Sequence, residues 1–152
     1  MGEVTPKVRT QATRSRGVTL VELLIVIIVI AVLAAIALPK FVNSSERSKE
    51  SSLHGDLKLV RDAVARYQGD TGLSPAMLFD LAANVAPIQG KNSSGTSTPL
   101  PAGTWNGPYL AALPTDPVSG ASFTYSTTSP TVGQVSSSAA GNDSNGVAFS
   151  TY

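Results

Sequence analysis

The ionisable side chain in the most demanding position of this 152-residue sequence is Glu22, the only charged residue in the apolar run from Val18 to Leu38. A carboxylate left unpaired in apolar surroundings is costly, so such a group generally has a partner and a function. Nucleophilic catalysis is not indicated, because the chain has no cysteine, its one histidine is His54, and no serine stands in a nucleophile-elbow sequence. We therefore expect Glu22 to pair with a positive charge, and we do not expect an enzyme.

The element that must position Glu22 is a hydrophobic helix. At a rise of about 1.5 Å per residue, Val18–Leu38 matches the roughly 30 Å core of a bilayer. Residues 1–17 carry four basic side chains and one acidic one, so they are expected to stay cytoplasmic while the C-terminal part crosses the membrane. An ordinary secretory signal cut after Ala35-Ile36-Ala37 is the alternative, but its apolar core would exceed the usual length of about 7–15 residues.

Composition limits the part of the chain after the apolar run to one small domain without disulfides. The chain has a net charge of +1 and no cysteine, and this charge gives no indication of nucleic-acid binding. Residues 92–152 are rich in Ser, Thr, Gly and Asn and contain only Asp116 and Asp143 as charges, which is typical of an exported or assembled surface. Such a domain needs a core, a metal or oligomerisation for its stability.

The residues around Gly17 resemble the class III signal of type IV pilins and type II secretion pseudopilins. A Gly stands just before the cut in that signal and a Glu stands fifth after it, as Gly17 and Glu22 do here. Val18 departs from the Phe that is usual at the first mature position. The resemblance implies that a prepilin peptidase removes 1–17 as a leader and that the new amine of Val18 is methylated.

The same resemblance implies that 18–39 stay attached as a transmembrane and assembly helix. Glu22 lies about 6 Å along the helix axis from Val18, roughly one turn. The amine of a subunit entering a filament could therefore meet the Glu22 carboxylate of its neighbour and set the register. The alternative is a protonated Glu22 that the membrane merely tolerates.

Helix is expected to continue past Pro39, which removes one ladder hydrogen bond and predicts a bend or loose point. The alanines between positions 31 and 37 would let backbones approach closely. Beyond Pro39, apolar residues recur at spacings of four and three from Leu53 to Tyr67, which predicts an amphipathic half packed on the globular part. Glu50 is placed where it could meet His54, and His54 is interpreted as a solvated side chain.

The C-terminal part is expected to fold as a head over 40–152. Ser74-Pro75 predicts the start of a short second helix over 75–86, whose Met77, Leu78 and Leu81 would face the long helix. The turn-rich segment 87–104 predicts an exposed loop. Alternating apolar residues predict strands at 123–126, 133–137 and 147–151. The expected fold is therefore α+β, a long N-terminal helix packed on a small antiparallel sheet.

A second resemblance follows in the order Trp105-Asn106-Gly107-Pro108-Tyr109-Leu110, Leu113-Pro114-Thr115-Asp116-Pro117 and Tyr125, which is similar to the major pseudopilins of type II secretion. Aromatic side chains between prolines also pin loops in any small β domain, so Trp105, Tyr109, Pro117 and Tyr125 are expected to be core anchors on either interpretation.

Calcium is implied for the head by this resemblance, through a loop to which Gly141-Asn142-Asp143 is similar. Calcium prefers about six to eight oxygen ligands, and here no second carboxylate follows Asp143. Two interpretations stay open, a plain turn and a weak calcium site that Asp116 would help to form.

The family implies a subunit of a homo-oligomeric helical filament that waits in the inner membrane as a single-pass precursor. Its expected partners are prepilin peptidase, assembly platform proteins and minor pilins or pseudopilins. The leading interpretation is a pseudopilin-like piston or scaffold for protein secretion, in a periplasmic or cell-surface filament. The alternatives are a major pilin for adhesion, motility or DNA uptake, and a membrane-anchored secreted domain that never polymerises.

Overall fold

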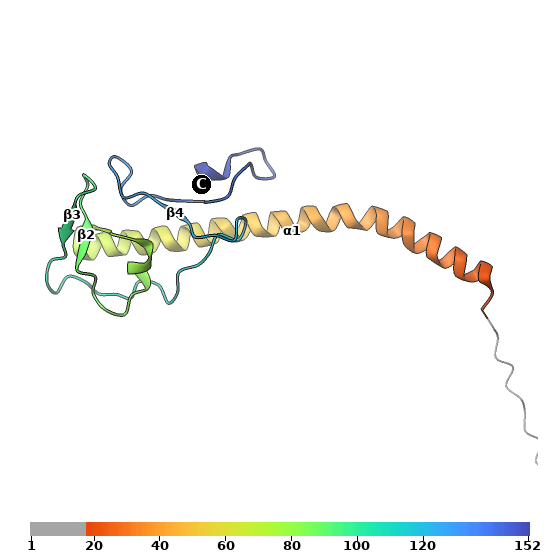
Figure 1. Ribbon diagram of the computed structural model, residues 1–152, viewed down its shortest axis with the longest axis horizontal. Helices are drawn as coiled ribbons and strands as arrows, with labels where there is room; N and C mark the ends of the chain where they lie inside the picture. The colour runs from red at the N-terminus through yellow and green to blue at the C-terminus, as the bar shows by residue number, and fades with distance from the viewer. Residues whose placement is uncertain (1–17) are drawn as a thin grey trace, which may run out of the picture. The chain divides into compact units, whose positions relative to one another are not determined.

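The computed structural model describes residues 18–152, apart from the side chains at positions 39, 42 and 43. Residues 1–17, which include Gly17 and are the expected leader, lie outside the described residues. One helix, α1, runs from Leu20 to Thr71 over 52 residues (Figure 1). The chain divides into two compact units after Phe41, and α1 contributes to both of them.

The first unit contains the apolar part of α1. Within the described residues, Leu20–Leu38 is the one segment that is long and apolar enough to cross a membrane, with a mean hydropathy of 3.2. None of it is buried by the rest of the chain, which distinguishes it from the core helix of a soluble protein. The helical assignment continues through position 39, and the bend predicted at Pro39 stays a prediction.

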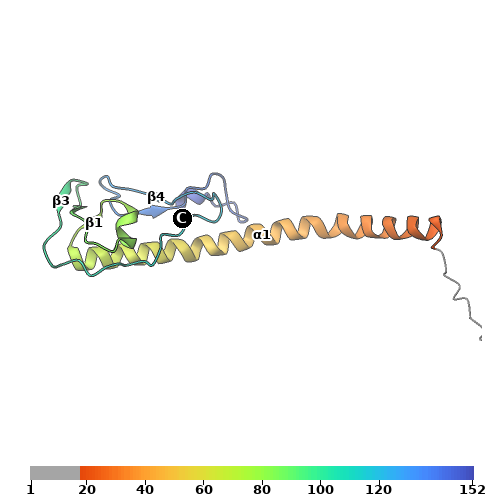
Figure 2. The same cartoon turned by 60° about the horizontal axis from the view of Figure 1, so that its bottom comes forward.

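The second unit is built around the C-terminal part of α1. The predicted stripe is confirmed, because Leu53, Leu57, Val60, Val64 and Tyr67 are all 0–3% exposed. Buried apolar side chains from the rest of the head pack against this stripe. They are Leu78, Leu81, Leu110, Phe123, Val135, Ala139 and Phe149. Both views show the strands and loops of the head lying along this part of the helix (Figures 1 and 2).

A three-stranded antiparallel sheet lies beside the end of α1, with the order β1 (Ser74–Pro75), β2 (Gln89–Lys91) and β3 (Ser97–Pro99). The prediction of an open loop over 87–104 is therefore wrong, because the segment forms a β2–β3 hairpin. Gly90 sits where β1 and β2 come close, and a Cβ there would lie 2.8 Å from the Cβ of Leu73. The backbones of β1 and β2 can thus pair this closely only because residue 90 is a glycine.

The second helix predicted over 75–86 is also wrong in its type and bounds. Ser74–Pro75 is strand β1, and only Leu78–Ala82 is helical, as the 3₁₀ helix η1. The Asp80 carboxylate accepts a hydrogen bond from the Met77 amide at 3.0 Å and so starts this turn. Leu78 and Leu81 are buried in the core beside α1 as predicted, whereas the same prediction for Met77 is wrong, because Met77 is 57% exposed.

A second, two-stranded sheet pairs β4 (Thr124–Tyr125) with β5 (Val135–Ser136), which confirms two of the three strands predicted near the C-terminal end. The side chain of Arg61 on α1 donates through Nε and Nη2 to the Val135 carbonyl, at 3.0 and 2.7 Å, and ties β5 to the helix. The third predicted strand is wrong, because Phe149–Thr151 forms the 3₁₀ helix η2. The α+β class, with a long N-terminal helix and small antiparallel sheets, is confirmed.

Candidate functional site

The N-terminal end of α1 is closed by a reciprocal pair of contacts between Thr19 and Glu22. Thr19 precedes the first helical residue, and its hydroxyl oxygen accepts a hydrogen bond from the Glu22 amide at 3.2 Å. Glu22 Oε2 accepts from the Thr19 amide at 3.2 Å and from its hydroxyl at 3.3 Å. This is a capping box, which satisfies two amides that no helical carbonyl could reach. In the single chain, the Glu22 carboxylate therefore has a local partner.

Glu22 also stands in the first turn of α1, where the positive end of the helix dipole stabilises a negative charge. Val18, the residue that would carry the new amine, comes directly before the capping pair and is 72% exposed. The structure thus places Val18, Thr19 and Glu22 together at one helix end. The Thr-x-x-Glu spacing of the sequence could have revealed the capping contact, which was missed because only the charge within an apolar run was considered.

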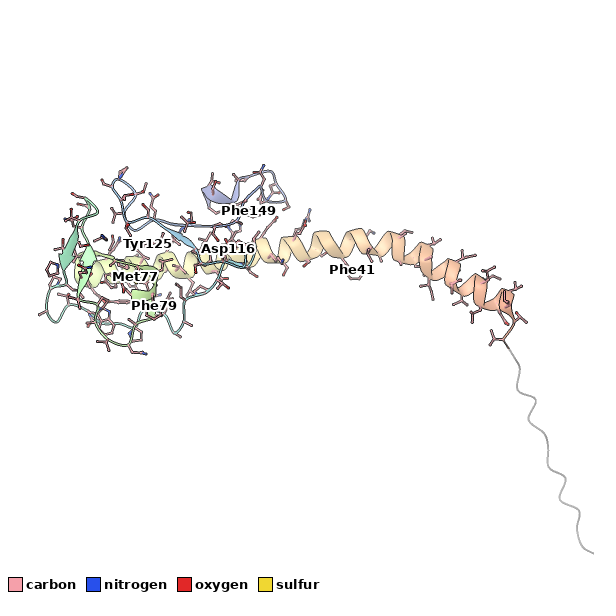
Figure 3. The ribbon with its side chains drawn as sticks, viewed as in Figure 1. Phe41, Met77, Phe79, Asp116, Tyr125 and Phe149 are labelled. Carbon is pink, nitrogen blue, oxygen red and sulfur yellow. The ribbon has the colours of Figure 1, made fainter. Side chains whose placement is uncertain are left out.

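The surface behind this helix end is apolar all round. Every Val, Ile and Leu from Leu20 to Leu38 is exposed, from 47% at Leu24 to 83% at Leu20. Phe41, just beyond, is 73% exposed and points away from the helix (Figure 3). A helix that is apolar on all sides needs a lipid or protein environment, because water alone would leave this surface uncovered.

In the head, the four expected anchors are spread along the core. The Tyr67 ring contacts that of Tyr109 at 5.4 Å between centroids, and Trp105 lies 6.4 Å from Tyr109 in an edge-on arrangement. The Tyr125 hydroxyl donates to the Pro75 carbonyl at 2.7 Å and so joins β4 to β1. Trp105, Tyr109 and Tyr125 pack against the buried cluster, and Pro117 is half-buried.

The sequence around the helix end matches a known family. Residues 12–38 match the family described as "Prokaryotic N-terminal methylation motif". The type II secretion system core protein G of Pseudomonas aeruginosa is 27% identical over 110 residues, which cover 68% of this chain and 78% of that protein. The core protein G of Klebsiella pneumoniae is 29% identical over 104 residues, 68% of this chain and 69% of that protein. The chain is therefore similar to proteins of the type IV pilin superfamily.

A further relative in this superfamily is the type IV major pilin protein PilA of Myxococcus xanthus. It is 48% identical over 72 residues, which cover 41% of this chain and 33% of that pilin. No solved structure matches the chain significantly. The matches to the core proteins G cover about two thirds of the chain, whereas the match to the pilin has a higher identity but covers 41% of the chain.

The head of this pilin-like chain contains a buried carboxylate, Asp116, which is 0% exposed. Its Oδ1 accepts from the amides of Val118 and Ser119 at 2.8 and 3.1 Å. Its Oδ2 accepts from the Ser137 hydroxyl and from the Ser138 amide at 3.0 Å. Burial alone would raise the pKa of Asp116, but these hydrogen bonds outweigh it and hold the pKa below its ordinary value. Asp116 therefore joins its own turn to the segment after β5.

Two buried polar atoms of the head have no hydrogen-bond partner among the described residues, the Tyr67 hydroxyl and Trp105 Nε1. Burial, with a smaller contribution from Asp80, raises the pKa of Tyr67 to about 12. Both side chains stand in the aromatic group around Tyr109, whose hydroxyl donates to Asp70 at 2.9 Å. Their apolar packing is what holds them there, because a buried group without a partner costs stability.

Asp116 and Asp143 have no hydrogen-bond partner in common among the described residues. The hydrogen bonds of Asp116 go to the turn after it and to Ser137 and Ser138, whereas those of Asp143 stay within its own loop and Tyr152. Over residues 18–152, no three His, Cys, Asp or Glu side chains gather in a way that could hold a metal ion. The Asp116 oxygens already accept from protein donors, so Asp116 does not fit the part of a ligand that completes a calcium site beside Asp143.

Proposed function

We propose that the chain is a structural subunit of a type IV pilin-like filament that acts in protein secretion, with a major-pseudopilin-like role. The observation that carries this proposal is the helix end described above. A carboxylate and the position of the new amine stand together at the tip of an apolar helix whose surface the chain itself leaves uncovered. Lipid would cover this helix before assembly, and the helices of other copies would cover it afterwards.

In this proposal, a prepilin peptidase cuts before Val18, and the methylated amine of Val18 pairs with Glu22 of a neighbouring copy. The capping box adds a condition to this step. Glu22 Oε2 is held by Thr19 in the single chain, so the incoming amine would share or replace that contact. The pair therefore checks register more than it adds net stability, because an ion pair in apolar surroundings must first lose its water.

Substitutions at Glu22 separate its charge from its capping role. Glu22→Gln keeps an oxygen that can accept from the Thr19 amide but has no charge, whereas Glu22→Ala loses both. If the charge pair sets the register, both variants are cleaved normally and neither forms filaments. Cleavage is read by N-terminal sequencing, and filaments are read by electron microscopy.

Two controls complete this test. Thr19→Val removes the capping hydroxyl and keeps the charge, so its filaments should form; Glu46→Gln removes an exposed charge outside the apolar segment and should change nothing. Normal filaments from Glu22→Gln would rule out the charge pair and leave only the capping role.

The second candidate function is that of a major pilin in a surface pilus, which the 48% identity to the Myxococcus xanthus pilin favours. The two candidates predict different locations for the same subunit. A surface pilus would yield long filaments in sheared surface material, with subunits that begin at Val18. A secretion filament would yield them only on overexpression, and its loss would stop the export of a secreted protein.

We also propose that the precursor spans the inner membrane once, with the assembly platform and minor pilins or pseudopilins as its partners. The apolar segment Leu20–Leu38 supports a single span. A membrane-anchored head that never polymerises is the remaining alternative. Such a protein would have no use for the charge of Glu22, so the absence of filaments from the wild-type chain even on overexpression would favour it.

A further inference from the structure

The C-terminal loop of the head, residues 141–152, is organised around Asp143. Asp143 Oδ1 accepts from the amides of Asn145 and Val147 at 2.9 and 2.7 Å. Its Oδ2 accepts from the Asn145 side-chain amide at 3.2 Å and from the Tyr152 hydroxyl at 2.5 Å. A carboxylate offers about four acceptor positions, so protein donors already occupy all of those that Asp143 has.

A second carboxylate fastens the same loop to α1. Glu50 Oε1 accepts from the Ser144 amide and Glu50 Oε2 from the Ser144 hydroxyl, both at 2.7 Å. Both oxygens of Glu50 therefore face one residue of the loop rather than His54, which the sequence had placed within its reach. Two-point attachment of this kind fixes the direction of the loop as well as its position.

Ring contacts complete the attachment. His54 on α1 meets the Tyr152 ring edge-on at 4.5 Å between centroids, and Phe149 lies 6.1 Å from Tyr152. His54 is exposed, as its interpretation as a solvated side chain requires, but it also packs on the loop. Phe149 is only 6% exposed, so closing the loop keeps this side chain in the core.

These contacts do not fit the calcium ion that the resemblance implied for this loop. Calcium would need about six to eight oxygens turned toward one point. Around Asp143 the chain instead turns N–H and O–H donors toward the carboxylate. The Glu50 carboxylate likewise accepts hydrogen bonds from the Ser144 amide and hydroxyl. A calcium ion would have to displace the Tyr152 hydroxyl and the backbone amides from Asp143.

We propose that Glu50, Asp143, Ser144 and Tyr152 form a metal-free clasp that closes the C-terminal loop onto α1, so that the stability of the head does not depend on calcium. The clasp acts where the chain has no cysteine to staple the loop. The titration of its members agrees with the geometry. The hydrogen bond with Tyr152 lowers the pKa of Asp143, and the same bond raises the pKa of Tyr152 to about 12.

The test uses the mature full-length chain in detergent micelles, with thermal melting and amide hydrogen exchange in millimolar calcium or in a chelator. The wild type should melt at the same temperature in both. Tyr152→Phe and Ser144→Ala should each speed exchange of the amides over 144–147 by about fivefold to tenfold, since each removes one hydrogen bond of the clasp. Ser94→Ala, an exposed serine in the β2–β3 turn, is the matched control and should leave those rates unchanged.

Either of two results would overturn the clasp. A rise in melting temperature with calcium that Asp143→Asn abolishes would show a calcium site in its place. Unchanged exchange over 144–147 in both Tyr152→Phe and Ser144→Ala would show that these contacts do not close the loop. Exchange of the core amides of Val60 and Val64 in the same samples separates opening of the loop from unfolding of the whole head.

Discussion

The two parts of α1 treat their apolar side chains in opposite ways. From Leu20 to Leu38, every large apolar side chain is exposed, by 47% or more. From Leu53 to Tyr67, the apolar stripe is 0–3% exposed, beneath side chains from the head. The first part is apolar all round, whereas the second has a single stripe and a charged opposite face.

Only one of the two parts of α1 depends on something outside the chain for its covering. The second part finds its covering within the same polypeptide, so its residues determine whether the head folds. The first part finds none, so its residues determine where the chain resides and what it assembles with. Substitutions of the same kind should therefore affect stability in one part and membrane insertion or assembly in the other.

The largest effect is expected in the buried stripe. Leu57→Ala should destabilise the head by about 2–5 kcal/mol, because it removes a fully buried side chain and leaves a cavity. Leu59→Ala is the matched control two residues away, since Leu59 is 46% exposed and should change the stability by less than about 0.5 kcal/mol. Urea denaturation in detergent, followed by circular dichroism, measures both. Equal losses of stability in Leu57→Ala and Leu59→Ala would contradict the conclusion that the buried stripe stabilises the head.

A charge in the middle of the exposed part should act on insertion alone. Val29→Lys should make membrane insertion less favourable by about 2.5–3.5 kcal/mol, the cost of a lysine at the centre of a span. Val29→Leu keeps the apolar surface and serves as the control. Carbonate extraction of membranes measures insertion, and the melting temperature of the head should stay the same in both variants. A lower melting temperature in Val29→Lys would mean that the two parts are coupled.

A smaller effect is expected at Asp116. Asp116→Asn turns an amide group toward donors that now bind a carboxylate, and it should cost about 1–3 kcal/mol of head stability. Insertion should not change, because Asp116 lies wholly in the head. Asp56→Asn, at a more exposed carboxylate on α1, is the control and should be close to neutral. Stability is again read from urea denaturation, and a loss no greater than that of the control would contradict the structural role of Asp116.

The smallest effects come from titration of the head. The folded pKa of Asp116 lies below its ordinary value of 3.8, so its stabilising contribution is present above that value and is lost as the pH falls through the folded pKa. The folded pKa of Tyr152 is raised from 10.0 to about 12, so its contribution is complete below pH 10 and is lost as the pH rises toward 12.

Melting temperature against pH should therefore fall at both ends of the range, and the variants should separate the two. Asp116→Asn should weaken the decline on the acid side, and Tyr152→Phe should weaken it on the alkaline side. Tyr152→Phe should retain part of its alkaline decline, because burial also raises the pKa of Tyr67. If the melting temperature of Tyr152→Phe fell as steeply at alkaline pH as that of the wild type, Tyr152 would not contribute to the alkaline loss of stability.

The stripe from Leu53 to Tyr67 could be predicted from the sequence because a helical period is a local property of the chain. The short elements of the head could not. Strand β1 contains Pro75 and exists only because β2 pairs with it, across a gap that Gly90 leaves free. Residues 147–151 alternate like a strand, but Phe149–Thr151 forms the 3₁₀ helix η2, and Tyr152 after it donates a hydrogen bond to Asp143.

In the candidate site, too, local features could be predicted from the sequence and contacts between distant segments could not. The position of Glu22 was readable as a charge in an apolar run, and its capping contact with Thr19 was readable from a short motif. The role of Asp116 could not be predicted from the sequence, because only the folding of the head brings Ser137 and Ser138 to its carboxylate. Contacts between segments far apart in the sequence leave no periodic signal.

Asp116 has a consequence for how this head can vary in evolution. One carboxylate serves donors on both sides of β4, in the turn that it begins and in Ser137 and Ser138. A substitution at 116 alone leaves these N–H and O–H donors without an acceptor. A simultaneous change at 137 removes one of the donors. Positions 116 and 137 should therefore covary among related heads, in contrast to positions in the apolar half of α1, where one aliphatic residue can replace another independently.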